Sequence, residues 1–367
     1  MTKTIFTSES VCAGHPDKIC DQISDAILDA VLAQDPNSHV GCEVLAGFNR
    51  VVIAGEIKSK AKIDIKKIAQ DQIKRLGYTD PKFNFSDQSP IENYVHEQSP
   101  EIAVGVDDEG AGDQGMMFGY ACTESQELMP LPIIMAHQLA QRIDQVREEK
   151  ILPYLRPDGK SQVTVEYNNG TPVSISQVVV AVPHEEKVKI SQVKNDIYQN
   201  VVEVVLARYG FKIDPKDVIL NGTGVWHNGG PAMDCGLTGR KIVVDGYGGY
   251  ARVGGGAFSG KDPTKVDRSG AYAARFIAKN IVANKLADRA EVRIAYFIGA
   301  KKPVMLQVET FGTNKKSQKI IDNFAEKILD TSVSGIIKEL DLQRPIYLPT
   351  AAYGHFGREE FPWERIV

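Results

Sequence analysis

The chain has 367 residues, with 43 Lys and Arg against 47 Asp and Glu, so its formal net charge is −4. At about 150 residues per domain, this length predicts two or three domains with cores large enough to need no disulfide or metal support. A nearly balanced charge with both signs interspersed argues against a protein that binds nucleic acid or membrane surfaces non-specifically.

The cysteines are scattered along the chain, at Cys12, Cys20, Cys42, Cys122 and Cys235. They form no Cys-x-x-Cys pair and no zinc-type spacing with histidines, which argues against a disulfide framework and fits a reducing compartment.

The longest apolar run, at residues 178–183, is far shorter than the ~18 residues of a membrane span, and the first 18 residues lack the apolar core of a signal peptide. The sequence therefore predicts a cytoplasmic protein.

The first repeating pattern begins near the N-terminus. Apolar residues at three- and four-residue steps predict an amphipathic helix over residues 16–33. Two β-rich runs, 40–48 and 50–57, predict a hairpin, and a second helix pattern follows at 65–76. The predicted order is helix, strand, strand, helix.

The same order returns twice. The second copy is predicted as a helix at 132–149, strands at 162–167 and 173–182, and a helix at 191–208. The third copy is predicted as a helix at 270–285, strands at 291–298 and 303–311, and a helix at 316–329. A repeat of roughly 120 to 130 residues suits duplicated domains rather than a solenoid. Antiparallel hairpins with helices on one face would give an α+β fold, although such an order is also common among unrelated α+β proteins.

Two segments between the repeats, residues 105–119 and 221–262, are rich in glycine. Residues 255–261 have the Gly-x-x-x-x-Gly-Lys spacing of a phosphate loop, after a strand-like run at 241–245. Asp262 and Pro263 follow where a phosphate loop has Ser or Thr and a helix, so this motif fails. The glycines still let backbone amides approach an anion, and charge is added by Lys261, Lys265 and Arg268. The alternative is a tight glycine turn with solvated lysines.

Charged residues also gather where the first predicted helix begins. His15 and Lys18 are predicted as donors to a metal-bound phosphate, and Asp17 as an oxygen ligand of Mg²⁺, because a helix N-terminus favours anions. The alternative is that Asp17 only pairs with the helix dipole. The adjacent cations Arg240 and Lys241 suit either an anion site or a solvated strand edge.

Four further residues are weaker candidates for a functional site. Asp158 and Lys160 lie in a Pro/Gly turn, where they would ordinarily be turn residues. Glu43 and Glu56 lie on predicted strands, and a carboxylate that faces a core needs a partner or a cation.

Four sequence motifs, taken together, are specific enough to indicate a protein family. They are residues 7–11 leading into 14–18, residues 110–115, residues 254–262 and residues 352–358. They closely resemble the S-adenosylmethionine synthetase (methionine adenosyltransferase) family, from Thr4 to about Trp363. The resemblance implies an α+β fold of three pseudo-threefold-related domains, each a β-sheet with helices on one face. The implied domains are 1–97, 111–228 and 229–367, with residues 98–110 as a mobile gate. It also implies a homodimer or homotetramer with active sites at a subunit interface.

The implied reaction converts ATP, L-methionine and water to S-adenosylmethionine, phosphate and diphosphate, with two Mg²⁺ and one K⁺. The implied catalytic residues, which act on the triphosphate, are His15, Lys261, Arg240 and Lys241. The remaining ATP positions are Asp158, Lys160, Trp226, Asp234 and Ala257, and the methionine positions are Glu56, Gln98, Asp234 and Lys265. The implied metal ligands are Asp17 and Asp267 for Mg²⁺ and Glu43 for K⁺.

Two departures from the family pattern stand out. Val225 occupies the place of an arginine that is common in bacterial members, and Trp226 replaces a phenylalanine and would stack on adenine. The segment 106–110 is also shorter than in many relatives. The competing functions are a P-loop-like kinase or NTPase and a non-catalytic nucleotide-binding protein.

Overall fold

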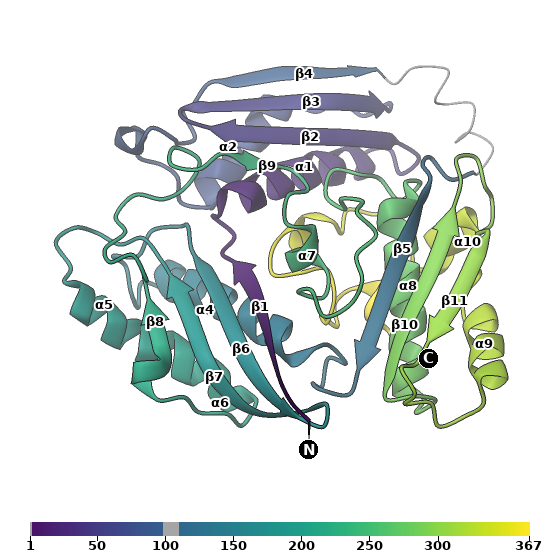
Figure 1. Cartoon of the computed structure of the whole chain (residues 1–367). Helices are drawn as coiled ribbons and strands as arrows, with labels where there is room; N and C mark the ends of the chain where they lie inside the picture. The colour runs from purple at the N-terminus through teal and green to yellow at the C-terminus, as the bar shows by residue number, and fades with distance from the viewer. Residues whose placement is uncertain (1, 98–109) are drawn as a thin grey trace.

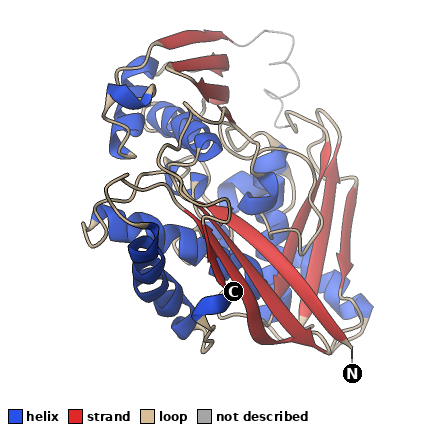
Figure 2. Ribbon diagram, turned by 60° about the vertical axis from the view of Figure 1, so that its left-hand side comes forward, coloured by secondary structure: helices blue, strands red, loops and turns tan. Residues whose placement is uncertain are grey.

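The computed structural model describes residues 2–97 and 110–367, so Gln98 and nearly all of the predicted gate lie outside the described residues. Three β-sheets lie around a central segment, and each sheet has helices on one face (Figures 1 and 2). This α+β architecture confirms the predicted fold class. Within the described residues, no helix is both long enough and apolar enough to cross a membrane.

The first sheet has the order β4-β3-β2-β9 and is covered by α1. Its elements are α1 (Pro16–Leu32), β2 (His39–Gly47), β3 (Arg50–Lys58), α2 (Ile65–Arg75), β4 (Ile91–Glu97) and β9 (Gly236–Leu237). The apolar stripe of α1, which includes Ile19, Ile23 and Ile27, is fully buried. Burial of this stripe against the sheet explains why the four-residue apolar period predicted the helix.

The second sheet has the order β1-β6-β7-β8 and packs on α4. Its elements are β1 (Lys3–Val11), α4 (Leu131–Glu148), β6 (Lys160–Asn168), β7 (Thr171–Ala181), α5 (Ile190–Ile197), α6 (Glu203–Arg208) and β8 (Val218–Leu220). A π-helical turn, Tyr198–Val202, joins α5 to α6, so the helix predicted at 191–208 is continuous.

The third sheet has the order β11-β10-β5 and packs on α8. Its elements are β5 (Gly115–Cys122), α8 (Val266–Ala283), β10 (Arg289–Tyr296), β11 (Met305–Glu309), α9 (Gln318–Lys327) and α10 (Val333–Glu339). β5 lies against α8 so closely that a Cβ on Gly119 would stand 2.0 Å from the carbonyl carbon of Ala274. Glycine at this position therefore permits the contact.

The leading strand of each repeat joins the sheet of a different repeat. β1 pairs with β6, β5 pairs with β10, and β9 pairs with β2, all antiparallel. The exchange is cyclic: first to second, second to third, and third to first. The chain must therefore pass from one sheet to another after each leading strand. The segment that follows β9 lies at the centre of the molecule, where it forms the short helix α7 (Ile242–Asp245) (Figure 1).

Two expectations from the sequence are wrong. Residues 241–245 were expected to be strand-like, but Lys241 is followed by one turn of helix, because the segment turns away from β9 at the centre of the molecule. The glycine-rich stretch 105–119 was expected to be a loop, whereas β5 begins at Gly115. Partners far away in the chain determine both outcomes.

Candidate active site

His15 caps the N-terminus of α1 and is buried. Its Nδ1 accepts the backbone N–H of Asp17 at 3.2 Å. Burial, together with the positive charges of Lys241 and Lys160, lowers the pKa of His15 to about 3, so the imidazole is neutral at pH 7. Because Nδ1 is the acceptor, the single ring proton lies on Nε2. This atom has no hydrogen-bond partner among the described residues, so it is a donor available to a ligand.

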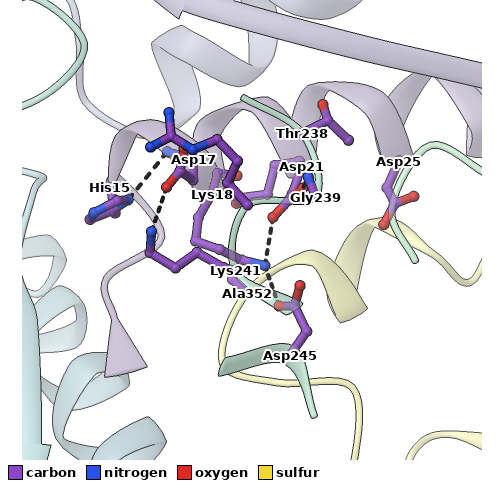
Figure 3. Close-up of polar contacts among 12 residues, drawn as sticks. His15, Asp17, Lys18, Asp21, Asp25, Thr238, Gly239, Lys241, Asp245 and Ala352 are labelled. Carbon is purple, nitrogen blue, oxygen red and sulfur yellow. Dashed lines mark hydrogen bonds and ion pairs between the residues drawn. The ribbon is translucent and has the colours of Figure 1, made fainter. Parts of the chain in front are cut away.

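Asp17, in the first turn of α1, is held by β9 and by the segment that follows it (Figure 3). Its Oδ1 accepts the N–H of Leu237 at 2.9 Å, and its Oδ2 lies 2.5 Å from Nζ of Lys241. Burial alone would raise the pKa of Asp17, but these two contacts hold it below its usual value. Arg240 Nε lies 3.9 Å from the same carboxylate, and its side chain is 54% exposed. Pairing of β9 with β2 thus places Arg240 and Lys241 beside Asp17.

Lys18 does not take the predicted role of phosphate donor. Its side chain is 1% exposed and turns inward, with Nζ 2.8 Å from Asp21 Oδ2 and 2.5 Å from Asp245 Oδ1 (Figure 3). Burial alone would lower the pKa of Lys18, but the two carboxylates raise it above its ordinary value. Lys18 therefore joins α1 to α7 and does not face a ligand.

A second group of predicted residues surrounds a cavity of about 450 Å³ between β2, β3 and the loop before α8. The lining includes Glu43, Glu56, Ala257, Lys261 and Lys265. Lys261 pairs with Asp267 in the first turn of α8, and Lys265 Nζ lies 2.7 Å from the buried carboxylate of Asp262. The cavity thus combines acidic side chains on the strands with lysines on the loop.

The loop that carries Lys261 lies along β2. Cys42 donates its N–H to the carbonyl of Gly260 at 2.9 Å, and Asp262 donates to the carbonyl of Val40 at 3.1 Å. A side-chain oxygen of Asp262 accepts the N–H of Val40 at 2.6 Å. Asp262, which breaks the phosphate-loop motif, is therefore the residue that attaches this loop to the sheet.

A third group lies around the turn before β6. Asp158 is buried, and its two oxygens accept the N–H groups of Gly159 at 2.7 Å and Gly230 at 2.8 Å. Burial raises the pKa of Asp158 to about 6. This carboxylate holds the loop that carries Trp226, whose indole is half-buried and donates Nε1–H to the carbonyl of Asn228 at 2.5 Å. Val225 is 58% exposed beside it.

The remaining predicted residues of this group are exposed. Lys160 is the first residue of β6, and Asp234 lies just before β9. Both are close enough to Asp158 for their charges to act on its pKa, Lys160 lowering it and Asp234 raising it. The fold therefore brings both residues near Asp158, although they lie on different elements.

Comparison with known proteins covers nearly the whole chain. Models of the N-terminal, central and C-terminal domains of S-adenosylmethionine synthetase match residues 3–100, 108–226 and 228–365 in that order. The chain belongs to the S-adenosylmethionine synthetase family. It is 51% identical to an S-adenosylmethionine synthase of Clostridium tetani, over 99% of this chain and 97% of that protein. It is 52% identical to one of Brachyspira hyodysenteriae, over 98% and 95%.

In this member of the S-adenosylmethionine synthetase family, three further aspartates of α1 hold distant segments of the chain, and two of them, Asp21 and Asp25, hold segments that carry residues of the candidate site. Asp21, Asp25 and Asp29 follow Asp17 along α1 and accept backbone N–H groups from the C-terminal part of the chain. Reasoning from sequence did not single them out. Their signal is the constant four-residue spacing, which places all four carboxylates on one face of the helix.

Proposed function

We propose that this chain forms S-adenosylmethionine from ATP and L-methionine, with release of phosphate and diphosphate. The observation that carries the proposal is the pair of lysine–carboxylate contacts, Lys241 with Asp17 and Lys261 with Asp267, in a chain that matches the family over nearly its full length. Such pairs supply positive charge for a polyphosphate and free a carboxylate when it binds.

The chemistry requires charge stabilisation rather than a base. The thioether sulfur of methionine carries no proton, so its lone pair attacks C5′ of the ribose directly while the bond from C5′ to the triphosphate oxygen breaks. The sulfur becomes positive, and the triphosphate leaves with roughly four negative charges that preorganised cations must stabilise. Water then cleaves the triphosphate to phosphate and diphosphate. No nucleophilic Ser or Cys is needed.

The residues divide these tasks by their charge. The neutral His15 donates its Nε2–H to a phosphate oxygen, while Arg240, Lys241 and Lys261 offset the triphosphate charge. When the triphosphate arrives, each lysine exchanges its carboxylate partner for phosphate oxygens. His15 can act only as a donor at Nε2, because the Asp17 amide occupies Nδ1.

The metal assignment is compatible with the donor set. The described residues contain no group of three His, Cys, Asp or Glu side chains arranged to hold a metal ion. Mg²⁺ commonly takes only one or two carboxylates and completes its shell with water and substrate phosphates, so Asp17 and Asp267 would each hold one ion. When bound, Mg²⁺ would neutralise part of the triphosphate charge. Glu43 would contribute to a K⁺ site from the cavity wall, which also includes Asp113.

Substrate recognition follows from the other residues. Glu56 and Lys265 line one cavity and offer opposite charges to the ammonium and carboxylate groups of methionine. On the ATP side, the indole of Trp226 would stack on adenine, and Lys160 and Ala257 would complete that site. Asp234 would contact both substrates, and Gln98 remains a methionine-side prediction outside the described residues.

We also propose a homodimer or a homotetramer. The support is a set of exposed apolar side chains on strands of all three sheets: Ile5 on β1, Leu45 on β2 and Met116 on β5. Alternation along each strand directs these side chains away from the covering helices. Light scattering coupled to size-exclusion chromatography tests this proposal, and a monomer at micromolar concentration would contradict it.

A turnover assay tests the function. The purified protein is incubated with ATP, methionine and Mg²⁺, with and without K⁺, and all products are measured. We expect equimolar S-adenosylmethionine, phosphate and diphosphate. Formation of ADP without S-adenosylmethionine would indicate a kinase or NTPase, and unchanged substrates would indicate a nucleotide-binding protein.

A further inference from the structure

Helix α1 carries four aspartates at four-residue steps, and each accepts a backbone N–H from the C-terminal part of the chain. The pairs are Asp17 with Leu237 at 2.9 Å, Asp21 with Gly239 at 2.8 Å, Asp25 with Gly260 at 2.8 Å, and Asp29 with Leu348 at 2.8 Å and Tyr347 at 3.0 Å. Figure 3 shows the first three carboxylates following one another along the helix. One rigid element therefore holds three separate segments.

Two of these amides belong to glycines that directly precede cations of the candidate site. Gly239 precedes Arg240 and Lys241, and Gly260 precedes Lys261. Both glycines have left-handed backbones, with φ of +78° and +81°. A Cβ would stand 2.5 Å from that of Ala257 at the first position and 2.0 Å from a backbone oxygen of Cys42 at the second. The backbone is thus tightly confined where each cation begins.

The two anchoring carboxylates are themselves held by buried cations. Asp21 directs one oxygen to Gly239 and the other to Lys18 at 2.8 Å. Asp25 forms a bidentate pair with Arg268 at 2.7 and 2.8 Å. Both carboxylates are fully buried, so a shift of either would leave charge unpaired in the interior.

We propose that Asp21 and Asp25 are positioning residues that fix the spacing between the two cation groups which receive the triphosphate. They lie one helical turn apart, about 6 Å along the axis of α1. Each carboxylate holds the amide of a glycine in place. That glycine lies two residues before Lys241 in one case and directly before Lys261 in the other. The inference rests on the proposed function, because it concerns the placement of Lys241 and Lys261 for that reaction.

Asp29 provides a matched control for a purely structural role. It lies on the same face of α1 and also accepts backbone N–H groups from the C-terminal part of the chain. The residues that it holds, Tyr347 and Leu348, precede no cation of the candidate site. If the aspartates only join parts of the chain, substitution of either should lower stability and leave kcat of the folded protein unchanged.

The experiment compares Asp21→Asn with Asp29→Asn in the full-length enzyme. Asparagine keeps the size but has one acceptor oxygen, so each variant loses part of its contacts. Thermal midpoints, kcat and KM for S-adenosylmethionine formation, and hydrolysis of added inorganic tripolyphosphate are measured. We expect Asp21→Asn to lower kcat and tripolyphosphate hydrolysis at least about tenfold, with KM for methionine changed less than about twofold. Asp29→Asn should lower the thermal midpoint but leave kcat within about twofold.

A second variant covers the case in which Asp21→Asn does not fold. Asp21→Glu keeps the negative charge beside Lys18 but moves the acceptor by one methylene, so the folded variant should lose kcat, and the overpacking should lower its thermal midpoint by a measurable amount. Equal kcat losses in the Asp21 and Asp29 variants would overturn the positioning role, and so would a normal kcat in a folded Asp21 variant. In either case, turnover by the wild-type enzyme would still support the proposed function. An inactive wild-type enzyme would overturn both.

Discussion

Replacement of Lys18 by methionine should destabilise the protein strongly and in a pH-dependent manner. The Lys18 ammonium is in contact with Asp21 and Asp245, and all three side chains are buried. Methionine has a similar length and flexibility, so the substitution removes the charge while largely preserving the packing. Two buried carboxylates then lose their shared cation.

The magnitude follows from this geometry. Removal of one partner from a buried ion pair typically costs about 3–5 kcal/mol in the free energy of unfolding. Burial already raises the pKa of Asp245 to about 7 in the wild-type protein, even though Lys18 opposes the shift. Without Lys18, this pKa should rise further, so the folded variant binds more protons than the folded wild type above pH 7. The stability deficit should therefore grow as the pH rises through 7 and be smallest in mild acid.

Urea-induced unfolding at pH 6 and pH 8.5 measures this effect, with tryptophan fluorescence, to which the buried Trp363 contributes, as one probe and circular dichroism as the other. The double variant Lys18→Met/Asp245→Asn should recover part of the lost stability, since one uncompensated carboxylate is removed with the cation. A loss below about 1 kcal/mol at pH 8.5, equal to that at pH 6, would refute the reasoning. That result would mean that water solvates these charges.

The remaining predictions concern the candidate site. Asp17→Asn should keep the fold, as seen by circular dichroism, but lower kcat/KM by roughly 10- to 150-fold through loss of one charge-assisted contact; near-normal turnover at ordinary Mg²⁺ would contradict the metal assignment. Glu43→Gln should abolish stimulation by K⁺ and retain the basal rate, whereas unchanged stimulation would place the cation elsewhere. Trp226→Ala should weaken ATP binding by about 1–3 kcal/mol in calorimetry without changing K⁺ activation, and unaltered affinity in a folded variant would argue against stacking on adenine.

Much of the secondary structure was predictable because the sequence patterns that indicate it are local. The periods of 3.6 and 2 residues that mark helices and strands depend on neighbours a few positions away. The helices of all three repeats and their hairpins were therefore found close to their true bounds, as for α1 and for the pair β2 and β3. The strands outside the hairpins were missed: β8 and β9, with three and two residues, carry too little pattern to be recognised, and the longer strands β1, β4 and β5 were also not predicted.

The sequence by itself determined the helix–strand–strand–helix order within each repeat, the glycine-rich loop at residues 254–259 and the strings that resemble the family, because each is a property of adjacent residues. The tertiary structure alone decided how these parts combine. Ser8 pairs with Val163 across the exchanged sheet, and Lys18 meets Asp245 from 227 positions away. Nothing in the string around Lys18 distinguishes a lysine that faces a phosphate from one that faces two buried carboxylates. Segments from the C-terminal part of the chain cover this face of α1 and bury Lys18. A buried charge needs a partner of opposite charge, and these segments supply Asp245.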